Sequence, residues 1–284
     1  MIMREGHRVS PSGSRTYYRY WSPGSGQARA TIAIVHGFGE HCELYSHLAE
    51  FFVARKYGVS ALDLRGHGRS AGPRGFIRGW DDYREDVETL MQVTGECLPS
   101  RPVFLVGHSM GGLIAVDYAL HYPGKLMGLV AMGPALGNIG VSPFLLRLSR
   151  IMSRIWPGFG LNTGLESENM SRDPQVVARL DADPLVHGRG TARLGTEVVD
   201  TIAKVRERAA ELAVPILIQH GEADTVALPD GSHWFYERIR HPDKQLKTYP
   251  GGYHNLFVDL NWREVLQDID DWVSPRLGAL AAFP

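Results

Sequence analysis

The sequence predicts an α/β fold in which helices cover both faces of a mostly parallel, doubly wound sheet. Three observations predict it. Short, continuous apolar runs bounded by turn residues recur along the chain, as strands buried on both faces require. Longer stretches with apolar residues at helical spacing separate these runs. One stretch, residues 136–214, shows no convincing strand and is too long for an ordinary connection.

The expected elements follow in chain order. The tyrosine-rich segment 15–21 predicts an antiparallel hairpin at the edge of the sheet. Buried strands are expected at residues 31–36, 58–63, 103–107, 126–132, 215–220 and 246–249. Helices are expected at residues 45–56, 83–96 and 262–273, and another is expected to begin directly after Ser109.

This pattern divides the chain into a core and an insertion. Residues 1–135 and 215–284 are expected to form the core, and residues 136–214 a helical cap over it. Within the cap, three arginines lie off a helical face whose members are Val141, Phe144, Leu145, Leu148, Ile151, Met152 and Ile155. Such an amphipathic helix either packs within its own domain or acts as a lid that lines an acyl-binding tunnel and touches lipid aggregates.

The composition excludes several classes of protein. Lysine and arginine number 30 and aspartate and glutamate 31, so no basic excess indicates a nucleic-acid partner. No apolar run approaches the roughly 18 residues that span a bilayer, and residues 1–10 lack the apolar region of a signal peptide. Two cysteines, Cys42 and Cys97, do not make a disulfide framework, so a cytoplasmic location is expected.

The segment Gly107-His108-Ser109-Met110-Gly111 matches the pattern Gly-x-Ser-x-Gly. It lies between an expected strand and an expected helix, which is the arrangement of the nucleophile elbow in the α/β-hydrolase fold. Glycines two residues before and after the serine allow strand and helix to approach closely. The sequence therefore predicts that Ser109 is a catalytic nucleophile.

Two backbone N–H groups are expected to form an oxyanion hole. In this fold one donor is the residue after the nucleophile, here Met110. The other comes from the loop after an early strand, here His36-Gly37-Phe38-Gly39, in which Phe38 is the best candidate. Two such donors stabilise the negative charge that develops on a carbonyl oxygen.

The order serine, acid, histidine along the chain selects the other catalytic residues. His254 follows the last expected strand, whereas the other histidines after Ser109 lie in less suitable places: His121, His187, His220, His233 and His241. Asp224 follows the preceding strand and is the first choice for the acid, with Glu222 as the alternative. A serine nucleophile excludes the dehalogenases and epoxide hydrolases of this fold, and the chemistry requires neither a metal nor a cofactor.

The chain resembles the monoacylglycerol lipase and lysophospholipase-like α/β-hydrolases, a group also called serine aminopeptidase S33 or hydrolase-4. Four features carry the resemblance: His36-Gly37-Phe38-Gly39-Glu40-His41, Asp63-Leu64-Arg65-Gly66-His67-Gly68-Arg69-Ser70, the serine motif extended by Gly112, and the acid and base segments around Asp224 and His254. The resemblance implies a lipase or esterase of lipid metabolism. Its substrates would be small esters or lipids, cleaved through an acyl-enzyme.

Two positions depart from that family's pattern. Leu44 stands where an arginine is frequent, and Phe257 stands where a second histidine occurs. Both polar residues are associated with glycerol, so a general carboxylesterase or lipase for medium-to-long acyl esters is expected. Glu40, Leu148 and Ile151 are predicted to contact substrate. A lysophospholipase or acyltransferase is the alternative, ahead of a peptidase or lactonase, and a non-catalytic binding module is disfavoured because all three catalytic positions are filled.

Overall fold

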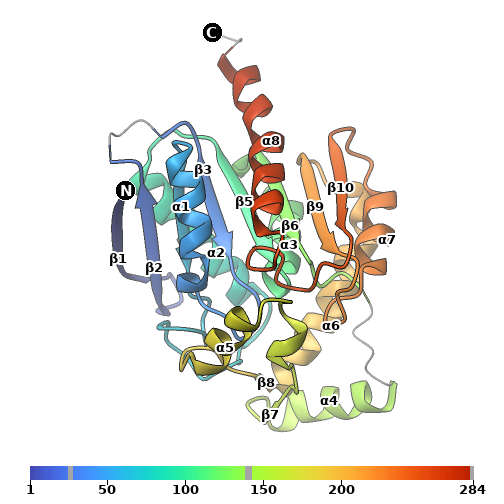
Figure 1. The fold of residues 1–284 in the computed structure, drawn as a ribbon. Coiled ribbons are helices and arrows are strands. Elements are labelled where there is room, and N and C mark those ends of the chain that lie inside the picture. Colours follow the sequence, from blue (N-terminus) through green and yellow to red (C-terminus); the bar gives the residue numbers. More distant parts are fainter. Residues whose placement is uncertain (25–27, 138–142, 282–284) are drawn as a thin grey trace.

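A mostly parallel, eight-stranded sheet forms the centre of the molecule in the computed structural model, which describes residues 1–24, 28–137 and 143–281 (Figure 1). Its spatial order is β1-β2-β4-β3-β5-β6-β9-β10. The strands are β1 (Ile2–Val9), β2 (Arg15–Ser22), β3 (Thr31–Val35), β4 (Gly58–Leu62), β5 (Val103–His108), β6 (Gly128–Met132), β9 (Ile216–Gly221) and β10 (Lys244–Tyr249).

The pairing of the strands confirms the predicted topology. Every pair from β4 to β10 is parallel, whereas β2 pairs antiparallel with both β1 and β4. The predicted edge hairpin is therefore present, and β1 is its outer strand. Parallel strands end on the same edge of the sheet, so the loops after β3, β5, β9 and β10 converge there.

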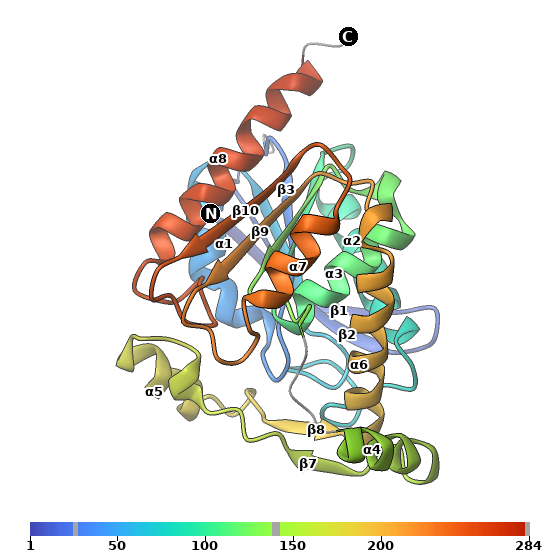
Figure 2. The same ribbon diagram turned by 90° about the vertical axis from the view of Figure 1, so that its right-hand side faces the viewer.

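Helices cover both faces of this sheet (Figure 2). On one face lie α1 (Ser46–Ala54) and α8 (Trp262–Ala281), and on the other α2 (Asp81–Cys97), α3 (Met110–His121), α6 (Ala192–Glu207) and α7 (Asp230–Arg238). Strand β3 shows how one sheet serves two cores. Ile32 and Ile34 pack with α1 and α8, whereas Ala33 and Val35 pack with α2 and α3.

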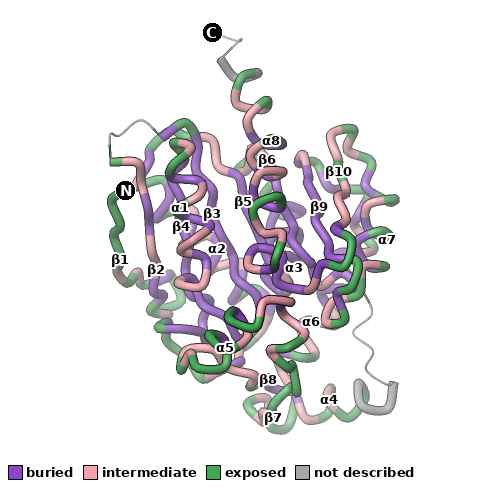
Figure 3. Tube along the Cα trace, in the orientation of Figure 1, coloured by how far each residue is buried: buried purple, intermediate pink, exposed green. Residues whose placement is uncertain are grey.

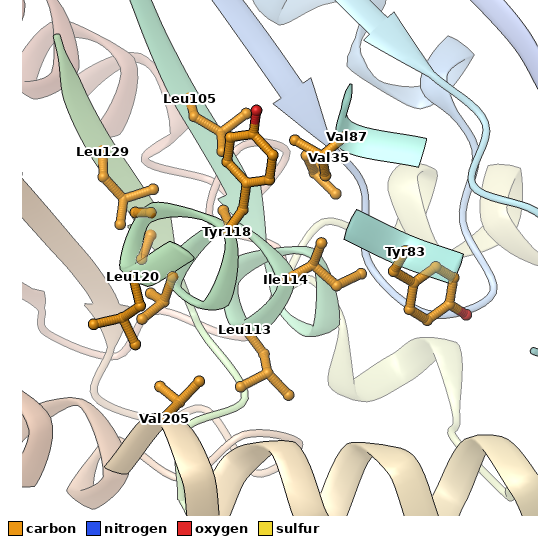
Figure 4. Packing of buried hydrophobic residues seen from close by; sticks show 14 of the residues in the cluster. Val35, Tyr83, Val87, Leu105, Leu113, Ile114, Tyr118, Leu120, Leu129 and Val205 are labelled. Carbon is orange, nitrogen blue, oxygen red and sulfur yellow. The ribbon is translucent and has the colours of Figure 1, made fainter. Parts of the chain in front are cut away.

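Helix α3 lies at the centre of the second core (Figure 4). Its residues Leu113, Ile114 and Tyr118 are fully buried; Tyr118 lies beside Leu105 of the sheet, whereas Leu113 points toward α6 (Figure 4). Burying an aliphatic side chain of this kind contributes about 1.5–3 kcal/mol. This packing fixes the start of α3, and with it the residue that precedes the helix, relative to the sheet.

Between β6 and β9 the described chain adds no strand to the main sheet. It forms α4 (Pro143–Ile155), α5 (Pro174–Ala182) and α6, with the two short strands β7 (Gly160–Asn162) and β8 (Arg189–Thr191) paired antiparallel. The expectation that this region contains no strand was wrong. Each strand has only three residues and no continuous apolar run, so the pattern that identifies buried strands is missing.

The distribution of exposure separates the sheet from this inserted region. The inner strands β3, β4, β5, β6 and β9 are almost wholly buried, whereas the edge strand β1 and most of the described residues of α4 and β7 are exposed or half-buried (Figure 3). Val141 and the side chains of Phe144 and Leu145, which belong to the predicted apolar face of α4, lie outside the described residues. Within the described parts of the chain, no helix is both long and apolar enough to cross a membrane.

Candidate active site

Ser109 lies at the sharp turn between β5 and α3. Its backbone has φ 54° and ψ −119°, a conformation that costs a residue with a side chain free energy. A Cβ atom at Gly107 would clash with the carbonyl oxygen of Gly111, and one at Gly111 would clash with that of Val35. The two glycines therefore permit the close approach of β3, β5 and α3 that holds Ser109 at the edge of the sheet.

His254 and Asp224 meet Ser109 at this edge. The hydroxyl Oγ of Ser109 lies 2.8 Å from Nε2 of His254 and donates to it, and Nδ1 of His254 lies 2.6 Å from Oδ2 of Asp224 and donates to that carboxylate. His254 comes from the loop after β10 and Asp224 from the loop after β9. The structure thus brings together the three residues that the sequence selected.

The protonation states suit proton transfer from the serine. Burial lowers the pKa of His254, and the hydrogen bond and charge of Asp224 only partly oppose this, so the imidazole is neutral near neutral pH and accepts a proton. Burial alone would raise the pKa of Asp224, but its hydrogen bonds with His220 and His254 hold that pKa well below its usual range. Asp224 is therefore ionised, and it holds the proton of His254 on Nδ1.

The alternative acid, Glu222, lies elsewhere. It is exposed at the surface, where its carboxylate accepts a hydrogen bond from the Thr248 hydroxyl at 2.8 Å. Asp224 is 3% exposed and receives the N–H groups of Val226 and Ala227 on Oδ1, at 2.8 and 2.9 Å. The geometry favours Asp224.

The loop after β3 lies directly beside Ser109. A Cβ atom placed on Gly37 would be 3.2 Å from Cβ of Ser109. The N–H groups of Phe38 and Met110 donate to no acceptor among the described residues, although both belong to segments that pack around the serine. Unpaired donors in this place match the requirement of an oxyanion hole.

The buried carboxylate of Glu40 holds this loop in place through hydrogen bonds. Its Oε2 accepts from the Gly37 N–H at 2.8 Å and from the Tyr45 hydroxyl at 2.6 Å, and its Oε1 accepts from Asn255 at 3.1 Å. Burial alone would raise the pKa of Glu40, but His108, Tyr45 and the Gly37 N–H lower it well below its usual range. These contacts, all with protein groups, favour a positioning role for Glu40 over the predicted substrate contact.

His108 connects Glu40 to the base. Its Nδ1 lies 3.3 Å from Oε2 of Glu40, and its Nε2 lies 3.2 Å from the carbonyl oxygen of His254. The ring of Phe257 packs edge-on against His108 and stacks on Tyr45 with ring centroids 4.3 Å apart. Phe257 is therefore part of the packing beneath the base, and its apolar ring fills a place where a second histidine would add a polar group.

A cavity of about 470 Å³ lies between α1, α5 and the start of α8. Leu44 and Phe257, the two departures from the family pattern, both line it. The other lining residues are mixed, with apolar Val176, Leu180, Val258 and Trp262 beside polar or charged Glu43, Ser46, His47, Glu50, Asp173, Arg179 and Asn255. Burial lowers the pKa of the His47 imidazole. Leu44 and Phe257 thus contribute apolar surface where a polar pair would offer hydrogen bonds to a polyol.

The three predicted substrate-binding residues do not form one surface. Glu40 is buried, whereas Leu148 and Ile151 on α4 are 45% and 53% exposed. Helix α4 is held to α6 by the ion pair of Arg150 with Asp200 at 2.7 Å. Leu148 and Ile151 thus lie on a helix, as predicted, but they do not share a surface with Glu40.

His220 is a residue of this site that the sequence did not select. It is fully buried at the end of β9, and its Nε2 lies 3.2 Å from Oδ2 of Asp224. The serine–acid–histidine order along the chain places His220 before Asp224 and so excludes it as the base, but this order carries no information about residues that pack behind Asp224. Among the described residues, no three histidine, cysteine, aspartate or glutamate side chains gather in a way that could hold a metal ion.

The family follows from comparison with known proteins. A family model described as serine aminopeptidase, S33, matches residues 26–261. The chain belongs to this family of α/β-hydrolases. Members share the serine hydrolase fold, and the described sheet and the elbow at Ser109 agree with that assignment.

Several relatives of this S33 family member carry lipase names. The monoacylglycerol lipase of Mycolicibacterium smegmatis is 36% identical over 93% of this chain and 95% of its own length. The human monoglyceride lipase is 32% identical over 95% of this chain and 90% of its own. The crystal structure of the Paleococcus ferrophilus monoacylglycerol lipase has a TM-score of 0.82 at 32% identity, covering 97% of this chain and 100% of that one.

One solved relative carries an esterase name. A carboxyl esterase from Bacillus coagulans, in complex with glycerol, has a TM-score of 0.84 at 26% identity and covers 98% of this chain and 99% of that one. Proteins similar to this chain thus include proteins named as lipases and a protein named as an esterase.

Proposed function

We propose that this chain hydrolyses carboxylic esters with Ser109 as nucleophile, His254 as general base and Asp224 as the acid that orients it. The observation that carries the proposal is the unbroken hydrogen-bond relay from Ser109 through His254 to Asp224, at 2.8 and 2.6 Å. The names of the S33 relatives, lipases and an esterase, support the same bond type.

The steps follow from the geometry. Nε2 of His254 takes the Ser109 proton as Oγ attacks the ester carbonyl carbon, and the oxyanion that forms accepts hydrogen bonds from the N–H groups of Phe38 and Met110. The imidazolium then gives its proton to the leaving alcohol, which leaves the acyl group on Ser109. Water, activated by the same imidazole, attacks the acyl-enzyme and releases the acid.

We further propose that the alcohol part of the substrate is not restricted to glycerol. Leu44 and Phe257 are apolar and line the same cavity, and Glu40 is engaged by protein groups. Monoacylglycerols and simple alkyl esters of the same medium-to-long acyl length are therefore expected to have similar kcat/KM values. A strong preference for monoacylglycerols would contradict this part of the proposal.

We also propose that residues 136–214 form a cap, of which the last helix, α6, also packs on the sheet, and that its helix α4 transiently contacts lipid aggregates. On α4, Leu148, Ile151 and Ile155 are 45%, 53% and 77% exposed. The same helix carries three exposed arginines, Arg147, Arg150 and Arg154. Exposed apolar and basic side chains on one amphipathic helix are typical of elements that lie at a lipid surface. Sedimentation with anionic phospholipid vesicles tests the contact, and no binding would contradict it.

The central test is Ser109→Ala. Removal of the nucleophile is expected to lower kcat for a p-nitrophenyl ester about 10⁶-fold, with an unchanged thermal unfolding midpoint. A panel of aminoacyl anilides, measured in parallel, checks the bond type. Retained esterase activity in Ser109→Ala would refute the proposed nucleophile, and faster cleavage of anilides than of esters would refute the substrate class.

A cytoplasmic location completes the proposal. Cys42 and Cys97 are both free thiols, which suits a reducing compartment. Fractionation of cells that express the protein tests the location directly.

A further inference from the structure

His220 is held from both sides of its ring. Its Nε2 lies 2.7 Å from the carbonyl oxygen of Ala227 and 3.2 Å from Oδ2 of Asp224. Its Nδ1 lies 2.7 Å from the hydroxyl Oγ of Ser232 on α7. His220, Asp224 and Ser232 are at most 3% exposed, so water does not compete for these contacts.

These neighbours fix where the ring carries its proton. The carbonyl oxygen of Ala227 is an acceptor only, so Nε2 of His220 carries the proton and donates to it. In the neutral ring Nδ1 is then an acceptor, and the Ser232 hydroxyl donates to it. The protonated Nε2 of His220 therefore binds the carbonyl of Ala227 and lies 3.2 Å from the carboxylate of Asp224.

Three N–H groups donate to the carboxylate of Asp224, and the protonated nitrogen of His220 lies beside it. Oδ2 receives Nδ1–H of His254 at 2.6 Å and lies 3.2 Å from Nε2 of His220, and Oδ1 receives the N–H groups of Val226 and Ala227. His220 also binds the carbonyl of Ala227, whose N–H reaches back to Oδ1. The ring therefore closes the turn of residues 224–227 around the carboxylate.

We propose that His220 is a positioning residue for the reaction: it holds the Asp224 carboxylate in the one orientation in which Oδ2 faces His254. This inference rests on the proposed roles of Ser109, His254 and Asp224. His220 touches no reacting atom, and its effect passes through Asp224 to the ring of His254. If that ring turns, Nε2 of His254 no longer faces the serine hydroxyl, and kcat falls.

Removal of His220 also changes the charge that His254 senses. Without the N–H of His220 3.2 Å away, the negative charge on Oδ2 is less stabilised and acts more strongly on the His254 imidazolium. The other titratable groups packed around His254 are His108 and Glu40, and substitution of His220 leaves both in place. The acid limb of the kcat/KM profile is therefore expected to move to higher pH.

Two amide substitutions separate this role from simple packing. In His220→Gln the amide nitrogen reaches the position of Nε2, so an N–H that binds the Ala227 carbonyl beside Asp224 remains. In His220→Asn the amide reaches only the position of Nδ1, near Ser232, and that N–H is lost. We expect His220→Asn to lower kcat about tenfold, which corresponds to about 1.4 kcal/mol, with KM unchanged and the acid limb at higher pH. His220→Gln is expected to stay within about threefold of the wild-type kcat.

The measurements are steady-state kinetics with a p-nitrophenyl ester across pH, normalised by titration of Ser109 with a fluorophosphonate. The low-field NMR signal of the His254 Nδ1 proton is recorded in the same samples, and it is expected to shift in His220→Asn and to persist in His220→Gln. Equal losses in both variants, or wild-type kcat and pH profile in His220→Asn, would overturn the proposal.

Ser232→Ala decides the question if His220→Asn does not fold. This change removes the hydroxyl that holds Nδ1 of His220, so the ring is fixed from one side only, and a smaller loss of kcat with a smaller shift of the acid limb in the same direction is expected. An unchanged profile would then overturn the proposal. Ser109→Ala and Asp224→Asn, measured alongside, identify failure of the proposed function itself, because full activity in either would contradict the triad independently of His220.

Discussion

Substitution of Glu40 by methionine tests whether the buried carboxylate holds the loop beside Ser109. Methionine keeps the length of the side chain but removes both oxygens. The Gly37 N–H, the Tyr45 hydroxyl and the amide of Asn255 then lose their acceptor. Each buried donor left without a partner costs about 1–3 kcal/mol. Because the variant also no longer buries a charge, we expect the low end of this range at each site, or about 3 kcal/mol in the free energy of unfolding.

Glu40→Gln is the matched control. Its amide oxygen, in the place of Oε2, still accepts from Gly37 and Tyr45. Its amide nitrogen faces Asn255, whose Oδ1 has no partner in the described chain and becomes the acceptor when the Asn255 amide turns over. Glutamine thus loses the charge but keeps the hydrogen bonds, and a cost of about 1 kcal/mol is expected.

Urea unfolding followed by tryptophan fluorescence measures both costs, and kcat for a p-nitrophenyl ester measures their effect on the site. Glu40→Met is expected to lower kcat by at least about tenfold, because Gly37 precedes Phe38 and its displacement moves an oxyanion donor. Glutamine should retain most of this activity. Equal free energies of unfolding for the two variants would refute the account, since the hydrogen bonds would then carry no weight beyond the charge.

Three further predictions concern the base, the cap and the elbow. Because burial lowers the pKa of His254, kcat/KM is expected to rise with pH to a plateau, with its midpoint below about 6.5. A pH–rate profile with a midpoint above that value would contradict this reasoning. Leu148→Asp or Ile151→Asp should raise KM for long-chain esters and spare short-chain ones, and a series of acyl lengths checks this; equal effects on all lengths would count against the lid. Gly111→Ala should destabilise the protein by at least about 2 kcal/mol and abolish activity, because its Cβ would clash with the Val35 carbonyl. The control Gly124→Ala, whose Cβ has open space, should leave activity unchanged, and thermal unfolding compares the two.

The sequence predicted those strands that the fold buries on both faces. Strand β3 is continuous in apolar residues because Ile32 and Ala33 face different cores, and the same requirement acts on β5 and β6. The strand β1 was predicted only as part of a hairpin, because most of its residues are exposed and no core selects them. The short strands β7 and β8 were not predicted for the same reason, since no core requires their residues to be apolar.

The residues proposed as catalytic could be selected from the sequence because chain order and strand ends constrain them, whereas the residues packed behind them could not. His108 is the last residue of β5 and directly precedes Ser109. His220 is the last but one of β9 and lies four positions before Asp224. Nothing in the spacing reveals that one ring meets the His254 carbonyl and the other the Asp224 carboxylate. These contacts arise because parallel strands end at the same edge of the sheet. The polar side chains near those ends are buried, so they must form hydrogen bonds with one another instead of with water. Buried histidines at strand ends are therefore the residues that sequence reasoning about this fold most easily misses.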